Sequence, residues 1–336
     1  MKKTLFTLGI LSILISCKGT NQINKQESTT DNNSLKWQTV SIADGSKPIQ
    51  RHEAAFVRVD EKFYLLGGRR IQPVSIYDPE TGSWYKGAKP PIEMHHFQPI
   101  TYQNKIYIIG AMTGKYPVET PTTHIYIYDP KTDQWSQGAE IPENRRRGST
   151  GNVLDNDVIY ISCGIKDGHR GDHKKWLDSY NLSTGKWTVL PDAPRARDHF
   201  QAVLSNGEIY VLAGRNTKAA ENPFKNTIGE VDVYNITSKT WKTLPNNLPT
   251  LRAGNMATVF NNEILVVGGE SATQPNAFDT VEALNPQTHE WRTLPSLVRG
   301  RHGSGLLTYK NALYIASGCG NAGGSPELFT MEKFSK

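Results

Sequence analysis

An eight-residue pattern recurs along the chain and constrains its fold more than any other feature. The first copy, at residues 77–84, has the sequence YDPETGSW, and later copies end at Trp135, Trp187, Trp241 and Trp291. Successive tryptophans in these copies are 51, 52, 54 and 50 residues apart. Upstream of each copy, and once more near the C-terminus, an apolar stretch ends in glycine or alanine. This period predicts a chain of tandem structural repeats.

Each repeat contains four short stretches rich in Val, Ile, Tyr and Leu, separated by polar turns such as Asn206-Gly207. A four-stranded sheet cannot bury both of its faces alone, so such units stack around an axis. The glycine column and the spaced Tyr and Trp resemble the kelch repeat, and the resemblance covers residues 35–334. It implies an all-β fold, a six-bladed kelch-type β-propeller, which we expect to occupy residues 35–336.

The sixth repeat lacks its final tryptophan, and the missing element occurs at the other end of the chain, around Trp37. We therefore predict that this N-terminal segment supplies the outer strand of the last blade, which closes the ring and removes exposed sheet edges. Cys163 and Cys319 fall in opposite blades, farther apart than the ~7 Å that a disulfide spans. They are expected to be buried free thiols.

The first seventeen residues have the features of a secretory signal. A basic head, Lys2-Lys3, precedes an apolar run that ends in the sequence LISC at Cys17. The run is too short to cross the ~30 Å hydrocarbon core as a helix. Its end resembles the bacterial lipobox, which implies a signal peptide at 1–16 and lipidation of Cys17. No Asp follows Cys17, which favours an outer-membrane lipoprotein facing the cell surface or the periplasm, and residues 17–34 are polar enough to form a flexible tether.

The charge of the chain argues against nucleic acid as a partner. The formal net charge is +6, and it becomes +4 when Lys2 and Lys3 leave with the signal peptide. Such a small excess, with no basic run other than residues 145–147, does not indicate nucleic-acid binding. We expect a monomer that contacts the membrane only through its lipid.

Functional groups are expected on one face of the ring, where variable loops connect the second and third strands of each repeat. The segments leading into the first strands lie on the same face. Seventeen residues before the end of each second strand stand Arg51, Met94, Arg147, Arg197, Arg252 and Arg301. Histidines accompany this column at His52, His95, His96, His199 and His302. We predict a mouth of guanidinium and imidazole groups that binds an acidic ligand.

Some of these residues have alternative roles. Each arginine of the column can instead brace adjacent blades. The sequence His-Phe-Gln occurs at both 96–98 and 199–201, which favours a functional role for the two histidines. The 167–178 loop adds His169 and His173, whose spacing can hold a metal in a hairpin. We expect this loop to contact the ligand, and we expect no cofactor, with a metal left as the alternative.

The mouth motifs resemble those of lipid-anchored kelch proteins from marine Bacteroidetes, and the chain is similar to the kelch-type dehydratases that act on ulvan oligosaccharides. The motifs are HHFQ at 95–98, RRRG at 145–148, the 168–178 loop, RDHFQ at 197–201 and RGRHG at 299–303. The resemblance implies a carbon–oxygen lyase that eliminates water from a terminal uronic acid, with acid–base roles for His96, His199 and His302. Binding of the acidic oligosaccharide then falls to Arg51, His52, His95, Arg147, His169, His173, Arg197, Arg252 and Arg301.

Two other functions suit the same mouth. One is a sugar mutarotase that resembles the six-bladed kelch epimerases of sialic acid, which also needs an acid and a base around a carboxylated sugar. The other is a non-catalytic surface lipoprotein that binds acidic glycans unchanged. A propeller fold alone does not choose among them, because the same fold supports enzymes, binders and scaffolds.

Overall fold

Six four-stranded antiparallel sheets make up the structure, a computed structural model that describes residues 1, 35–216, 218 and 221–336. The predicted signal peptide (1–16), the lipidated Cys17 and the tether (17–34) lie, apart from Met1, outside the described residues. Within the described part, no helix has the length and apolar character needed to span a membrane.

Each sheet is one blade, and its four strands follow one another outward from the axis. Blades one and two contain β2 (Ala54–Val59), β3 (Lys62–Gly67), β4 (Ser75–Asp78) and β5 (Ser83–Lys86), then β6 (Ile100–Tyr102), β7 (Lys105–Ile108), β10 (His124–Asp129) and β11 (Gln134–Glu140). Blades three and four contain β12 (Gly151–Asp155), β13 (Val158–Ser162), β14 (Leu177–Asn181) and β15 (Trp187–Leu190), then β16 (Ala202–Ser205), β17 (Glu208–Val211), β18 (Asp232–Asn235) and β19 (Thr240–Thr243). Blades five and six contain β20 (Met256–Phe260), β21 (Glu263–Val267), β22 (Val281–Leu284) and β23 (Trp291–Leu294), then β24 (Leu306–Tyr309), β25 (Ala312–Ala316), β26 (Met331–Ser335) and β1 (Lys36–Thr39). Outside the blades are a ribbon of β8 (Met112–Thr113) and β9 (Thr120–Pro121) and two 3-10 turns, η1 (Glu143–Arg145) and η2 (Gly168–Arg170).

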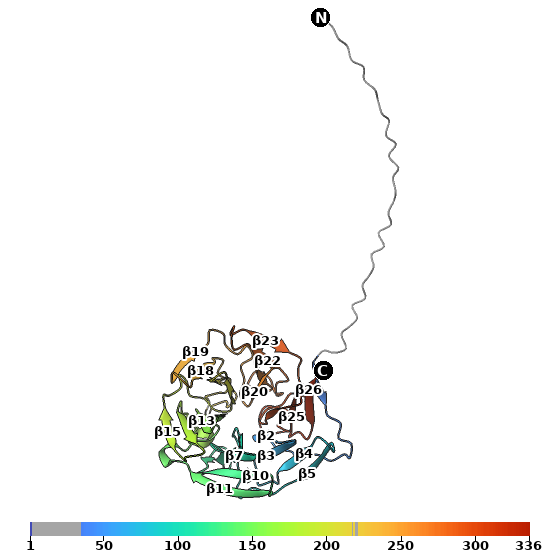
Figure 1. Ribbon diagram of the computed structural model, residues 1–336, viewed down its shortest axis with the longest axis vertical. Helices are drawn as coiled ribbons and strands as arrows, with labels where there is room; N and C mark the ends of the chain where they lie inside the picture. Colours follow the sequence, from blue (N-terminus) through green and yellow to red (C-terminus); the bar gives the residue numbers. More distant parts are fainter. Residues whose placement is uncertain (2–34, 217, 219–220) are drawn as a thin grey trace. The chain divides into compact units, whose positions relative to one another are not determined.

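The first strands of the blades form a closed ring. Strand β2 contacts β6 and β24, β12 contacts β6 and β16, and β20 contacts β16 and β24. Figure 1 shows the blades succeeding one another around this ring from blue to red. Strand β1 pairs with β26, with Trp37 opposite Phe334, so the N-terminal strand completes the last blade. These observations confirm the predicted six-bladed propeller and its mode of closure.

Contacts between and within blades explain the repeated residues. The repeat Tyr and Trp pack together inside a blade, with ring centroids 5.2 Å apart for Tyr77 and Trp84. Gly67 ends β3 with φ of 73°, and a Cβ there would lie 2.5 Å from the ring of Phe97, in the chain leading to the next blade. Glycine thus admits Phe97 as a wedge between blades. That wedge anchors the residue before it, His96.

The two described cysteines occupy the interior, as predicted. Cys163 and Cys319 are buried free thiols. Burial raises the pKa of the Cys163 thiol to about 11, so this residue is in its protonated, apolar form at neutral pH.

Candidate functional site

One position in each blade, just before the first strand, lies in the left-handed region of backbone conformation. The six residues have φ of 51–65° and are Glu53, His96, Ser149, His199, Gly254 and Gly303. This conformation is uncommon for residues that carry a side chain, and such residues cluster at functional sites. Blades five and six use glycine, whereas blades one, two and four each place an ionisable side chain there.

Hydrogen bonds join these six positions into a ring around the axis. The N–H donors and their oxygen acceptors, at 2.6–3.1 Å, are His96 to Glu53, Ser149 to His96, His199 to Ser149 Oγ, Gly254 to His199, Gly303 to Gly254, and Ala54 to Gly303. The backbone of all six blades therefore holds the side chains in place before any ligand binds.

Three spaces follow one another along the axis. The outermost, which we call the mouth cavity, measures about 390 Å³, within the range of small-ligand pockets. It is lined by His52, Glu53, Arg69, His96, Tyr116, His169, His199, Arg215, Pro223, Phe224, Glu270, His302, Gly323 and Gly324. Below it a neck of about 30 Å³, lined in part by Glu53, His96 and His199, has room for water but not for a sugar.

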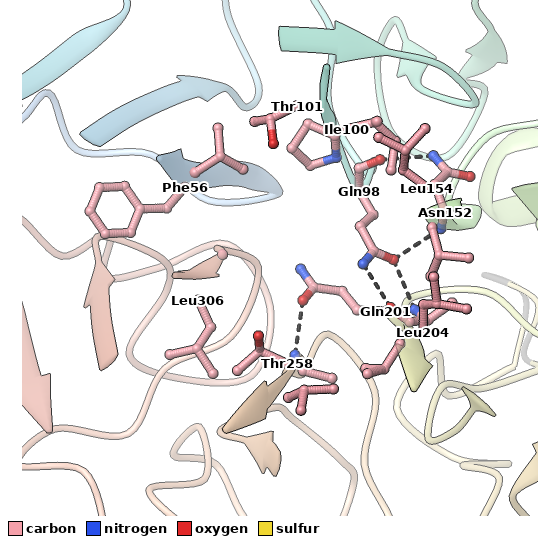
Figure 2. Close-up of a pocket in the computed structure, with 18 residues that line it drawn as sticks. Phe56, Gln98, Ile100, Thr101, Asn152, Leu154, Gln201, Leu204, Thr258 and Leu306 are labelled. Atoms are coloured by element: carbon pink, nitrogen blue, oxygen red, sulfur yellow. Dashed lines mark hydrogen bonds between the residues drawn. The ribbon is translucent and has the colours of Figure 1, made fainter. Parts of the chain in front are cut away.

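The third space, about 430 Å³, opens at the other end of the axis and has a different character. No residue that lines it carries a titratable side chain. Figure 2 shows Gln98 and Gln201 there, each hydrogen-bonded to residues of other blades. Gln98 Oε1 accepts hydrogen bonds from the N–H groups of Asn152 (3.0 Å) and Ala202 (2.8 Å). The His-Phe-Gln motif therefore divides its roles: His faces the mouth cavity, Phe wedges the blades and Gln ties the first strands.

Three imidazoles converge in the mouth cavity. The ring nitrogens of His96, His169 and His199 that face one another all lie within 4.8 Å. Nε2 of His169 is 3.2 Å from Nε2 of His199. Burial lowers the pKa of both His96 and His199, so both rings are unprotonated at neutral pH. We call these three residues the imidazole cluster.

A buried carboxylate lies beside each ring of this cluster. Glu119 Oε2 lies 3.0 Å from Nδ1 of His169, and Asp198 Oδ1 lies 3.2 Å from Nδ1 of His199. Glu53 Oε2 lies 3.3 Å from Nε2 of His96. Burial alone would raise the pKa of Glu53, but His199, which becomes charged at low pH, and the charge of His302 lower it to about 2, so Glu53 is ionised at neutral pH.

His302 lies apart from the imidazole cluster in the same cavity. Its Nε2 is 3.3 Å from Glu270 Oε2 and its Nδ1 is 3.7 Å from Glu53 Oε1. Burial alone would lower the pKa of His302, but the charge of Glu270, a hydrogen bond with Cys319 and the charge of Glu53 raise it to about 10. The cavity thus contains a protonated imidazole, His302, and two unprotonated ones, His96 and His199.

Two guanidinium groups line the mouth cavity. Arg69 Nη2 donates to Glu119 Oε1 at 2.7 Å, and Arg215 Nη1 donates to Glu270 Oε1 at 3.1 Å. An arginine has five N–H donors, so each keeps donors for a ligand. The ring of Phe224 lies under Arg215, with the guanidinium carbon 5.6 Å from the ring centroid.

The sequence analysis missed Arg69, Arg215 and Glu270. All three immediately follow the glycine that ends a second strand, at Gly68, Gly214 and Gly269. Extending the repeat register by one residue would have found them. Glu119, Tyr116 and Phe224 come from the long second-to-third-strand loops, whose paths the register does not specify.

The prediction that the arginine column binds substrate is wrong. Arg51, Arg147, Arg197, Arg252 and Arg301 are 0–2% exposed, and none of them lines the mouth cavity. Their side chains run outward between the second and third strands of their own blades. The four that meet a carboxylate pair with Asp178, Asp232, Glu282 and Glu332, on β14, β18, β22 and β26 respectively. Arg51 instead donates to the carbonyls of Gly67 and Pro73.

Two predicted substrate-binding histidines are also absent from the cavity lining. His95 is fully buried behind the cluster, where its Nδ1 is 2.5 Å from Nδ1 of His96 and its Nε2 is 3.2 Å from the Gly114 carbonyl oxygen. His173 contacts Asp198 at 3.3 Å and does not line the cavity, whereas His169 does. His52, His96, His169, His199 and His302 do line the cavity.

Comparisons with known proteins agree with the fold. The family model described as the Attractin/LZTR1 beta-propeller matches residues 18–278. The chain belongs to the Attractin/LZTR1 β-propeller family. A curated relative of this propeller is the Kelch-like protein terF of Aspergillus terreus, 30% identical over 302 residues that cover 84% of the chain and 64% of terF. The matched region therefore spans less than two thirds of terF. The similarity shows that this chain is a kelch-like propeller.

Two further comparisons concern proteins that are not named as kelch-like. The N-acetylneuraminate epimerase of Haemophilus influenzae is 22% identical over 299 residues, which cover 71% of the propeller chain and 77% of the epimerase. A solved structure titled "Structure of YjhT" superposes with a TM-score of 0.71 at 15% identity, covering 85% of this chain and 95% of that one. At this identity the superposition shows a shared fold only.

Proposed function

We propose that the protein is an acid–base enzyme that eliminates water from a terminal uronic acid of acidic oligosaccharides. The observation that carries the proposal is the meeting, in one cavity, of the imidazole cluster and the separate, ion-paired His302. An elimination needs a base on one side of the substrate and an acid on the other. The mouth cavity supplies both on a rigid ring of backbone.

The step balances without an added reactant. The imidazole cluster removes the proton on the carbon next to the carboxylate, and the electrons of that bond form the carbon–carbon double bond. The bond to the β hydroxyl breaks, and His302 protonates the departing oxygen, so that one water leaves. Arg69 and Arg215, rather than the arginine column, would bind and neutralise the carboxylate, which makes the adjacent proton more acidic.

The size of the cavity supports action on chain ends. The neck of about 30 Å³ prevents an oligosaccharide from passing along the axis. A terminal sugar would enter the mouth cavity while the rest of the oligosaccharide extends past the rim, where His52 pairs with Glu327 at 2.7 Å.

Mass spectrometry tests the proposal directly. Purified protein is incubated with a glucuronate-ended oligosaccharide, and we expect a product lighter by one water that absorbs in the ultraviolet through its new conjugated double bond. A binding signal for the same sugar by calorimetry, without any lighter product, would overturn the elimination and favour a glycan-binding protein.

A second candidate is a mutarotase or epimerase of carboxylated sugars. It is favoured by the similarity to N-acetylneuraminate epimerase, which extends over most of both chains. The same acid and base would serve ring opening and closure at the anomeric carbon. Exchange between anomers, followed by NMR, should accelerate with the protein if this candidate is right, and the sugar mass should not change.

We also propose that the protein is an outer-membrane lipoprotein, as the lipobox-like sequence before Cys17 suggests. Expression of the full chain in cells fed a labelled fatty acid should label the protein. The variant Cys17→Ala should abolish the label, and a labelled variant would contradict attachment at this residue.

A further inference from the structure

We propose that His96, His169 and His199 bind a divalent transition-metal ion at the base of the mouth cavity. The three residues come from different segments: two precede the first strands of blades two and four, and His169 lies in η2, within a loop of blade three. Their convergence is therefore a product of the whole ring and not of a local sequence motif. It differs from the His169–His173 pairing that the sequence suggested.

The hydrogen-bond partners determine which ring nitrogens carry protons. A carboxylate only accepts, so Glu119, hydrogen-bonded at 3.0 Å, favours a proton on Nδ1 of His169. The charge of the Asp198 carboxylate, 3.2 Å from Nδ1 of His199, favours a proton there as well, although the hydrogen-bond partner of that nitrogen is the Ser149 hydroxyl at 3.5 Å. In both rings the lone pair then resides on Nε2. Those two Nε2 atoms are 3.2 Å apart and face each other.

The same argument applies to His96 through its neighbour. The carbonyl oxygen of Gly114 accepts from Nε2 of His95, so the neutral His95 ring accepts at Nδ1. Nδ1 of His96, 2.5 Å away, must supply that proton. The lone pair of His96 is left on Nε2, 3.3 Å from the carboxylate of Glu53, so two acceptors face each other there unless a cation lies between them. Three lone pairs therefore converge with no donor among the contacts described between them.

A bound cation resolves this repulsion and fits the dimensions. Imidazole nitrogens bind Zn²⁺ at about 2.0–2.1 Å in tetrahedral geometry, which places two ligand nitrogens roughly 3.3 Å apart. The separation of 3.2 Å between the Nε2 atoms of His169 and His199 matches that edge. Carboxylates on the outer nitrogens of two ligands are the usual support of a histidine metal site.

The charge of the mouth cavity also favours a cation. Among the residues described around it, four carboxylates face three cationic groups. The carboxylates are Glu53, Glu119, Asp198 and Glu270, and the cationic groups are Arg69, Arg215 and His302. An empty site would carry a net negative charge and repel an acidic sugar, whereas a divalent ion reverses the sign.

Three protein ligands leave one coordination position of the ion open toward the mouth cavity. This part of the inference rests on the proposed function: the open position would accept the substrate carboxylate, or a water whose hydroxide form replaces the imidazoles as base. Borderline ions that favour imidazole, with Zn²⁺ first, are the expected occupants.

Metal content and binding test the inference without any substrate. The purified full chain is stripped with a chelator, dialysed, and titrated with Zn²⁺ or Co²⁺ alone, followed by calorimetry and elemental analysis. We expect about one ion per chain, and for Co²⁺ a visible absorption band typical of nitrogen ligands. No binding to the folded wild type would overturn the proposal.

Variants locate the site. His169→Gln should weaken binding at least about 100-fold, and Glu119→Gln about 10–100-fold, because it orients a ligand from outside. His52 lines the same cavity outside the cluster, so the His52→Gln variant should bind the metal ion as tightly as the wild type does. An equal loss of metal binding in all three variants would contradict the assigned ligands. Circular dichroism confirms folding, and Glu119→Gln serves alone if His169→Gln does not fold.

The outcomes separate this inference from the proposed function. A protein that binds one ion at the cluster but converts no sugar retains the metal site and loses the proposed elimination. A stripped protein that still eliminates water at the wild-type rate retains the function and excludes a role of the metal in it, while the titration alone decides whether the metal site exists.

Discussion

The arginine column and the mouth cavity are both built from buried charges, yet they are used differently. Arg197 and His199 are two residues apart, but Arg197 runs outward to Asp232 in its own blade at 2.7 Å. His199 points to the axis and contacts His169, which belongs to another blade. The arginines of the column are thus paired with groups of their own blade, whereas the charged side chains of the mouth cavity contact groups from other blades.

This difference teaches how to separate structural from functional charge in a repeat protein. A partner in the same repeat compensates a buried charge locally and leaves nothing for a ligand. Partners from different repeats converge on the axis, where a cavity remains between them. Burial does not distinguish the two groups, because Arg197 and His302 are both no more than 1% exposed.

The largest expected effect is on stability, and it comes from breaking one buried ion pair of the arginine column. Arg252 Nη1 donates to Glu282 Oε2 at 2.6 Å, and both groups are buried. Glu282→Gln leaves the guanidinium without a counter-charge and should lower the free energy of unfolding by about 3–5 kcal/mol. Denaturant titration followed by circular dichroism measures it.

A surface pair provides the matched control for that measurement. Arg292 and Glu263 also bridge strands of blade five, but the Arg292 side chain is 57% exposed. Glu263→Gln should change the free energy of unfolding by less than about 1 kcal/mol. Equal losses of unfolding free energy in the two variants would show that the buried ion pairs of the column do not stabilise the blades more than surface pairs do.

The second prediction concerns the cavity. His302→Gln should lower turnover of the proposed substrate about 100-fold or more, because it removes the acid. Turnover is measured by mass spectrometry, and His289→Asn, in the β22–β23 turn outside the cavity lining, is the control. A turnover within threefold of the wild type would remove His302 from the mechanism.

The third prediction is the pH dependence that His302 imposes. Glu270, Glu53 and Cys319 face this ring and raise its pKa to about 10, so it carries its proton below pH 10 and loses it above. As pH rises through 10, kcat/KM should fall about tenfold per unit, because the acid form disappears. His302→Gln should lack this alkaline limb, and a limb that persists in the variant would assign it to another group.

The sequence predicted the propeller because its repeat is strict, with tryptophans about fifty residues apart and Trp37 supplying the missing copy. It also predicted that five of the histidines that line the mouth cavity lie on one face of the ring. It did not predict Glu119 or Tyr116, because they lie in a loop peculiar to one blade. Paths of such loops depend on long-range packing that no repeat register encodes.

The error over the arginine column was avoidable from the sequence. A carboxylate stands two residues before the repeat Tyr position, which is Leu284 in blade five, in each blade whose arginine forms an ion pair, as Asp232 does before Tyr234. In blade two, where Met94 replaces the arginine, Tyr126 replaces the carboxylate. In blade two arginine and acid are therefore absent together, which indicates a pair formed within the blade rather than a ligand site. Blade one is the exception, because Arg51 has Ser75 at the acid position and donates to its hydroxyl.

Blade two suggests the prediction with the smallest expected effect. Met94 and Tyr126 fill the space of the ion pair with apolar contacts and are 0% and 6% exposed. Apolar residues of similar volume often replace a buried ion pair without loss of stability, since the desolvation of both charges is avoided.

The double variant Arg252→Met with Glu282→Leu should therefore have a free energy of unfolding within about 1 kcal/mol of the wild type, in contrast to Glu282→Gln alone. The same denaturant titration measures both, and turnover per folded molecule should be unchanged because neither residue lines the cavity. If the double variant is as unstable as the single one, the paired charges stabilise the blade more than apolar packing does, and the column is then more than a local compensation of charge.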